Sequence, residues 1–278
     1  MGSTKREIAH NFSPHGIINK DGSIDRLSGN EIEENLSSRL FLPTSVDASK
    51  KLPLLLYYHG GGFCIETPFS LTYHSYLKTL VAEAEIIAVS VDYRRAPEHP
   101  IPVPYDDSWT PLKWAASLVN GDGCTSLEIV LAPGGNIAHH MGMRYGQERL
   151  PGINVAGTVL IHPYFWGKER IGNEVNEREA VREGIDAIGC DDPLINPIKD
   201  ARLPSLGGSK MLVFIAGNDV LRDRGWLYYE TLNKNGWGGK VEIMEAKEEV
   251  HVFHLSNPSS VNAVAMRRKF ISFMHEDR

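Results

Sequence analysis

The stretch Leu54-Leu55-Leu56-Tyr57-Tyr58-His59-Gly60-Gly61-Gly62-Phe63 joins an apolar run directly to a glycine triplet. The apolar run has the length and composition of a buried β-strand. Glycines just past such a strand let several backbone N–H groups converge on one point, which is how an oxyanion hole is built. The alternative is a tight loop in which the glycines serve only positive φ angles. Because the strand and Phe63 supply the required context, we predict that Gly61 and Gly62 donate the N–H groups of an oxyanion hole.

The turn that should carry a nucleophile opposite this hole contains no serine. Such a nucleophile sits in the pattern G-x-S-x-G on a sharp strand-to-helix turn, and the chain contains no such pentapeptide. The segment that best fits the position is 129–140, Ile-Val-Leu-Ala-Pro-Gly-Gly-Asn-Ile-Ala-His-His. It predicts a buried strand, a turn and the start of a helix, with no hydroxyl group in the turn.

Composition excludes several classes of protein. A chain of 278 residues with 42% hydrophobic residues is long enough for one large α/β core. The net charge of −6, with no long basic run, argues against nucleic acid as a partner. No apolar stretch reaches membrane-spanning length, and no signal-peptide pattern opens the chain. The three scattered cysteines favour a reduced, cytoplasmic setting, and no Cys/His spacing predicts a metal site.

Apolar runs alternate with helical patterns along the chain, which predicts an α/β fold with a mostly parallel central sheet flanked by helices. We interpret residues 1–278 as a single domain, with a hairpin around Lys20-Asp21-Gly22-Ser23 and a small cap built from about 1–35 and 168–200. The expected strands are 54–58, 86–92, 128–132, 155–162, 211–216 and 241–245. The expected helices are 73–83, 106–118, 136–145, 223–235 and 258–274, with Gly236 at a helix C-terminus.

Two further residues complete the predicted catalytic set. In an α/β sheet of this kind the acid and then the histidine follow the nucleophile, each on a loop after a strand. Asp219 comes first after the strand 211–216, and Asp223 is better explained as a helix cap. His251 lies on the loop after 241–245, and His254 is expected on the other side of that turn. We predict that His251 is the general base and that Asp219 fixes its tautomer, against the alternative of a surface histidine and a capping aspartate.

Hydrophobic side chains near these loops are expected to form the substrate pocket. Phe63 and Ile65 follow the glycine turn and predict an apolar wall beside the oxyanion hole. Phe165 and Trp166 follow the strand 155–162, and loops at the carboxyl ends of parallel strands line the ligand crevice. We therefore expect a small-molecule substrate in an apolar pocket.

Six motifs are spread over the chain: HGGGF at 59–63, VDYRRAPEHP at 91–100, NIAHH at 136–140, DPLINP at 192–197, GNDVLRD at 217–223 and HVFH at 251–254. In these motifs the chain resembles plant carboxylesterases of the hormone-sensitive-lipase-like branch of the α/β-hydrolases over nearly its whole length. That branch also includes 2-hydroxyisoflavanone dehydratase, the gibberellin receptor and alkaloid cyclases. The resemblance implies an α/β-hydrolase fold, oxyanion donors at Gly61 and Gly62, a triad acid at Asp219, a base at His251 and no cofactor.

The departure from the family pattern lies at the nucleophile. Relatives read Leu-Ala-Gly-Asp-Ser-x-Gly-x-Asn-Ile, whereas this chain passes from Ala132 directly to Pro133. We hypothesise that a longer polypeptide carries Gly-Asp-Ser between these two residues, which predicts a Ser-His-Asp carboxylesterase acting on a small ester or plant metabolite. Two alternatives stay open: a dehydratase or cyclase on the same scaffold, and a non-catalytic small-molecule receptor. The sequence allows a monomer or a homodimer.

Overall fold

The structure, a computed structural model, describes residues 8–12, 16–19, 24–26, 36–44, 51–119, 127–172, 174 and 191–276. Its main sheet has seven strands in the order β10-β9-β8-β7-β5-β6-β4. All neighbouring strands are parallel except β4, which runs antiparallel to β6. The strands are β4 (Ser37–Phe41), β5 (Leu54–Tyr58), β6 (Ile87–Asp92), β7 (Leu127–Pro133), β8 (Ile153–Ile161), β9 (Lys210–Ala216) and β10 (Lys240–Ala246).

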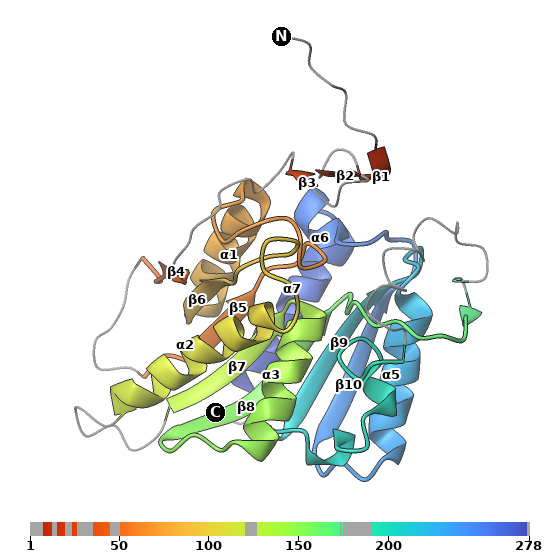
Figure 1. Ribbon diagram of the computed structural model, residues 1–278. Helices are drawn as coiled ribbons and strands as arrows, with labels where there is room; N and C mark the ends of the chain where they lie inside the picture. The colour runs from red at the N-terminus through yellow and green to blue at the C-terminus, as the bar shows by residue number, and fades with distance from the viewer. Residues whose placement is uncertain are drawn as a thin grey trace.

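Helices cover both faces of this sheet and make three layers (Figure 1). On one face lie α2 (Val103–Val119), α3 (Gly135–Gln147) and α5 (Arg222–Lys234). On the other lie α1 (Leu71–Ala84) and α7 (Val261–His275), and the short α6 (Phe253–Ser256) precedes α7. Among the described helices, none combines the length and the apolar character needed to cross a membrane.

Successive side chains of the buried strands point alternately into two hydrophobic cores, one on each face of the sheet. Leu54, Leu56 and Tyr58 of β5 pack into the core under α2, α3 and α5, while Leu55 and Tyr57 pack against α1 and α7. This is the period of two that a strand imposes when both of its faces are covered. The carboxyl ends of the parallel strands meet at one edge, and the loops that follow them carry the site.

The α/β architecture and the predicted strands and helices are confirmed, with ends that differ by a few residues. The hairpin is present as β2 (Gly16–Asn19) and β3 (Ile24–Arg26), which with β1 (Ile8–Phe12) form a separate antiparallel sheet. Gly236 has φ 86°, as expected for a residue that follows a helix.

The predicted helix cap at Asp223 is wrong. Asp223 is the second residue of α5, and its carboxylate pairs with the Arg222 guanidinium at 2.7 Å. Of the predicted cap, 1–7, 13–15, 20–23, 27–35, 173 and 175–190 lie outside the described residues. The cap therefore stays a prediction.

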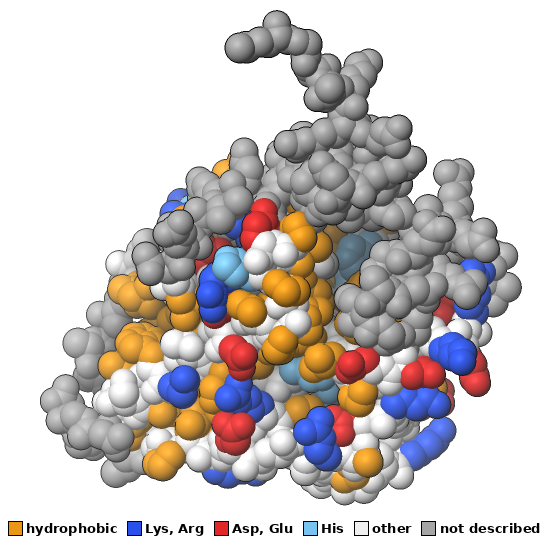
Figure 2. All heavy atoms as spheres, viewed as in Figure 1, with side chains coloured by type: hydrophobic (Ala, Val, Ile, Leu, Met, Phe, Trp, Pro, Cys, Tyr) orange, Lys and Arg blue, Asp and Glu red, His pale blue; other side chains and the backbone are white. Residues whose placement is uncertain are grey.

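Side chains of both charges are mixed on the surface, as the modest net charge of −6 would suggest. Figure 2 shows acidic and basic side chains interspersed over the lower part of the face that carries α2, α3 and α5.

Candidate active site

The glycine turn after β5 lines a cavity with two of its residues, Gly61 and Gly62. The φ angles of Gly61 and Gly62 are 111° and 58°, and a Cβ at Gly61 would lie 2.1 Å from the carbonyl oxygen of Ile65. The N–H groups of Cys64 and Ile65 both donate to the Gly61 carbonyl oxygen at 3.0 Å, and these two bonds close the turn. The N–H groups of Gly61 and Gly62 donate to no other described residue, and both residues line one cavity. The turn therefore brings to the cavity two backbone N–H groups that have no partner among the described residues.

Buried aromatic residues fix this turn from behind. The Tyr73 hydroxyl accepts from the Gly60 N–H at 3.1 Å, and the Tyr93 hydroxyl donates to the His59 carbonyl at 2.8 Å. The His59 ring stacks on Tyr93 with 4.2 Å between centroids. Burial lowers the pKa of His59 to about 3, against a smaller opposing effect of its hydrogen bond to the Gly60 carbonyl. His59 is thus neutral near pH 7 and acts as a support of the turn.

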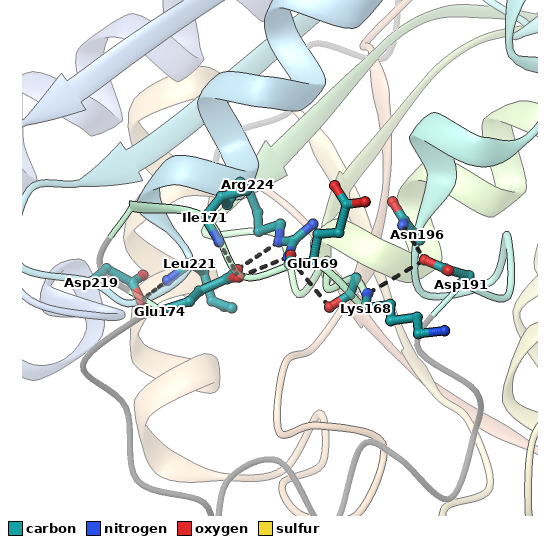
Figure 3. Close-up of polar contacts among 10 residues, drawn as sticks. Lys168, Glu169, Ile171, Glu174, Asp191, Asn196, Asp219, Leu221 and Arg224 are labelled. Carbon is teal, nitrogen blue, oxygen red and sulfur yellow. Dashed lines mark hydrogen bonds and ion pairs between the residues drawn. The ribbon is translucent and has the colours of Figure 1, made fainter.

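Asp219 and His251 form a hydrogen-bonded pair that reaches this cavity. Asp219 follows β9, is 3% exposed, and accepts the Leu221 N–H at 3.0 Å (Figure 3). Its other oxygen lies 2.7 Å from Nδ1 of His251, whose side chain is half exposed and lines the cavity. Burial alone raises the pKa of Asp219, but the hydrogen bond and charge of His251 outweigh it and hold the pKa below its usual value. The carboxylate therefore orients Nδ1–H, which leaves Nε2 for proton transfer.

The place of the nucleophile is occupied by a turn that has no hydroxyl group. Ala132 and Pro133 continue β7 in register with Tyr57 and Tyr58 of β5, and the Gly134 N–H donates to the Tyr58 carbonyl at 2.7 Å. Helix α3 begins at the next residue. A Cβ on Gly134 would lie 2.7 Å from that same carbonyl oxygen, so the helix is held close to β5. The strand–turn–helix unit is present in the 278-residue chain and its serine is not.

The cavity between the glycine turn and α3 has a volume of about 120 Å³. Gly61, Gly62, Phe63 and His251 are predicted site residues that line it, and Asp219 lies directly behind His251. His254, which was expected on the other side of the turn, is buried and lines the same cavity.

Three predicted pocket residues are not part of the cavity wall. Phe165 and Trp166 are buried, but Phe165 packs against His139 and Tyr228, and Trp166 packs against Ile195 and Leu221. Both side chains thus belong to hydrophobic clusters. Ile65 is used within the glycine turn, where its N–H closes the turn.

The site also holds a histidine that the motif analysis did not single out. His162 follows β8 and is 4% exposed, and one donor atom each of His162, Asp219 and His251 lie within 4.8 Å of one another. A metal site needs free lone pairs. Here Nδ1 of His162 accepts the Val252 N–H at 2.8 Å, and Nδ1 of His251 faces Asp219. The Nδ1 atoms of both histidines are thus already engaged in hydrogen bonds.

An ion pair anchors the segment after Trp166 to the helix that follows Asp219. The Arg224 guanidinium of α5 makes two hydrogen bonds to the Glu174 carboxylate, the second at 2.7 Å, and also donates to the Glu169 carbonyl (Figure 3). Arg224 is 5% exposed and Glu174 is 1% exposed. The pair therefore fixes part of the predicted cap beside the Asp219 loop.

Comparisons with known proteins agree with this geometry. Residues 55–255 match the family model described as the α/β-hydrolase fold. Probable carboxylesterase 7 of Arabidopsis thaliana is 41% identical over 298 aligned residues, which cover 99% of this chain and 94% of the relative. 2-Hydroxyisoflavanone dehydratase of Glycine max is 37% identical over 316 residues, with 97% of this chain and 99% of the relative covered.

A solved structure shows the same fold. The Pyrobaculum calidifontis esterase superimposes with a TM-score of 0.69 at 24% identity, and the match covers 86% of this chain and 80% of that one. With the family model, the full-length relatives and the site geometry in agreement, the chain belongs to the plant carboxylesterase family of the α/β-hydrolases.

Proposed function

We propose that the cavity is a site of carboxylic ester hydrolysis. His251 acts as the general base and acid, Asp219 orients it, and the N–H groups of Gly61 and Gly62 stabilise the oxyanion of the tetrahedral intermediate. The observation that carries the proposal is the Asp219–His251 hydrogen bond of 2.7 Å beside a cavity that also receives both unused glycine donors. The cavity volume of about 120 Å³ favours a small acyl group.

We further propose that a Gly-Asp-Ser tripeptide between Ala132 and Pro133 completes the site. The alignment with the Arabidopsis relative spans 298 residues, more than the 278 of the whole chain, so the relative carries residues that this chain lacks. Without the hydroxyl, His251 has only water to activate, and loss of a triad nucleophile lowers the rate on the order of a million-fold. The residue after the restored serine would be Pro133, which has no N–H. That missing donor lowers acyl transfer by roughly 10² to 10³.

The test compares three proteins: the 278-residue chain, the chain with Gly-Asp-Ser inserted after Ala132, and the matched insertion Gly-Asp-Ala. We expect the serine insertion to hydrolyse p-nitrophenyl acetate at least ~10³-fold faster than the other two, because the nucleophile is restored while one oxyanion donor is still missing. It alone should be labelled by an organophosphate. Equal rates and equal labelling in all three folded proteins would contradict the proposal.

A second candidate function is elimination or cyclisation of a plant metabolite. Two observations favour it: the turn 132–135, Ala-Pro-Gly-Gly, has no nucleophilic side chain, and a dehydratase is 37% identical over 97% of the chain. In that reaction His251 moves a proton and no acyl-enzyme forms. Turnover of a β-hydroxy ketone by the 278-residue chain, abolished by His251→Ala, would select this function over ester hydrolysis.

A further inference from the structure

His162 occupies a position between the predicted base and the core. It is the residue directly after β8, it has φ 45°, and its ring centroid lies 5.4 Å from that of His251. Phe253 and His254 contact the other parts of the ring, each with a centroid distance of 5.6 Å. The His162 ring thus contacts the predicted base, His251, and the first two residues of α6, Phe253 and His254.

Among the described residues, the His162 ring makes one hydrogen bond, to the backbone beside the base. Nδ1 of His162 accepts the N–H of Val252 at 2.8 Å, and Val252 is the residue immediately after His251. Val252 has φ 50°, a left-handed conformation that β-branched residues rarely adopt. A contact from outside the loop is needed to hold such a residue in place.

Hydrogen bonds to other elements hold the loop that carries His251 on both sides of this residue. Before His251, the Asn218 N–H donates to the Glu249 carbonyl at 2.9 Å, and the Asn218 side chain donates to the Glu248 carbonyl at 3.0 Å. After His251, the Val252 N–H donates to His162, and within the loop the Phe253 N–H donates to the Val250 carbonyl at 3.3 Å. Loss of the bond to His162 would therefore remove one restraint on the half-exposed imidazole of His251.

The chemistry of His162 suits this role. An imidazole nitrogen that accepts an N–H is unprotonated, so Nδ1 must keep its lone pair and the proton sits on Nε2. Burial lowers the pKa of His162 well below its ordinary value, and the charges of His254 and His251 lower it further, whereas Asp219 alone raises it. The ring therefore stays an acceptor even when His251 takes up a proton.

We propose that His162 is a positioning residue: its neutral imidazole holds the Val252 N–H and thereby keeps His251 against Asp219 and facing the glycine donors. The inference rests on the proposed role of His251 as base, but it concerns the placement of that side chain and not the turnover of any ester.

The experiment uses the 278-residue chain and two amide variants of one position. In His162→Asn the side-chain oxygen can take the place of Nδ1, and asparagine tolerates positive φ. In His162→Gln the longer side chain carries its oxygen beyond that place. The readout is the downfield proton resonance of the hydrogen-bonded His251 Nδ1–H, identified by its loss in Asp219→Asn. We expect it in the unmodified chain and in His162→Asn, and we expect it to be lost to solvent exchange in His162→Gln.

A role in packing alone would affect both variants alike. If the resonance persists in folded His162→Gln, or disappears from folded His162→Asn, the proposal is overturned. A second measurement needs no variant: the Val252 amide should exchange with solvent at least tenfold more slowly than an exposed loop amide, and the ¹⁵N shifts of His162 should show the Nε2–H tautomer. A fast-exchanging Val252 amide or an Nδ1–H tautomer would also overturn it. None of these readouts depends on ester hydrolysis, so each can fail while the proposed function stands.

Discussion

Gly61 and Gly62 are neighbours in one turn but face different steric limits. A Cβ at Gly61 would come within 2.1 Å of the Ile65 carbonyl oxygen, whereas a Cβ at Gly62 would meet no atom of the described residues within 4 Å. Both residues have positive φ angles, so any substitution at either position carries the cost of a left-handed conformation. The clash with backbone is specific to Gly61.

This difference predicts unequal costs of the same substitution. Gly62→Ala should lower the free energy of unfolding by about 1 to 2 kcal/mol, the usual cost of a left-handed alanine. Gly61→Ala should lower it by about 3 kcal/mol or more, because the turn must also move away from Ile65. Urea unfolding of the two variants and the parent measures both values. Equal losses would show that the turn adapts to a side chain at Gly61.

Asp219 is expected to act through His251 alone. In the serine-insertion protein, Asp219→Asn should lower kcat by about 10⁴-fold, because an asparagine no longer selects the Nδ1–H tautomer of the base. The control is Asp223→Asn, whose carboxylate pairs with Arg222. Its rate should stay near that of the parent in a p-nitrophenyl acetate assay. A similar loss in both variants would argue for a general electrostatic effect.

The candidate site was predicted from sequence where its residues belong to local patterns. Gly61, Gly62, Asp219 and His251 each follow an apolar strand closely, so the end of the strand places them. The pocket residues depend on which way a loop turns after its strand, and Phe165 and Trp166 turn into the packing.

His162 was not predicted because its role depends on a contact with Val252, which lies far along the chain. The pattern Ile161-His162-Pro163 at a strand end was the only local signal.

Residues 167–172 and 174 are held in place by a buried ion pair. Glu174 and Arg224 are both more than nine-tenths buried, and Arg224 also donates to the carbonyls of Gly167 and Glu169. A buried charge that loses its partner costs much more than an exposed one. The ion pair therefore fixes the position of this segment against α5.

Removing one charge of this pair should be strongly destabilising. Glu174→Gln should lower the free energy of unfolding by about 3 to 5 kcal/mol, because it leaves the Arg224 charge buried and uncompensated. The exposed pair Glu230–Lys234 on α5 is the control, and Glu230→Gln should cost less than about 0.5 kcal/mol. Both values come from urea unfolding. A cost below about 1 kcal/mol for Glu174→Gln would mean that solvent reaches Arg224.

Strands with continuous apolar runs were predicted from sequence, and β4 was not. β4 (Ser37–Phe41) lies at the edge of the sheet, and only Phe41 in it is buried. Its sequence Ser-Ser-Arg-Leu-Phe has too few apolar residues to indicate a strand. Such a strand forms because β6 offers free backbone groups for pairing, which is a tertiary effect that local sequence does not encode.

At the scale of the whole molecule, buried histidines make stability depend on pH. Burial lowers the pKa of His59 and His254 to about 3 and that of His140 to about 4, from 6.5, and it holds the pKa of His139 and His162 well below the ordinary value. The unfolded chain therefore binds more protons than the folded one once the pH falls below about 6.5. This contribution to stability is complete above that pH and is lost as the pH falls toward the folded values.

We expect the protein to unfold in mild acid. Each of these histidines lowers the free energy of unfolding by a little over 1 kcal/mol per pH unit, so five together approach about 7 kcal/mol per unit. Since domains are stable by about 5 to 15 kcal/mol, unfolding should occur between about pH 4.5 and 6. Urea unfolding at stepped pH measures the slope, and His254→Phe should reduce it by about one proton. A constant free energy of unfolding from pH 7 to pH 5 would contradict the expectation.

The β7 strand keeps its two-sided packing up to the turn that lacks a serine. Ile129 and Leu131 belong to the core under α3, and Val130 belongs to the core under α1 and α7. An odd number of residues removed from within the strand would have exchanged these faces, whereas removal at the turn leaves them unchanged. The packing of the two hydrophobic cores therefore does not depend on whether the turn after β7 carries a reactive side chain. In such a fold, the gain or loss of a few residues in one turn can add or remove a catalytic group while the sheet and its helices keep their structure.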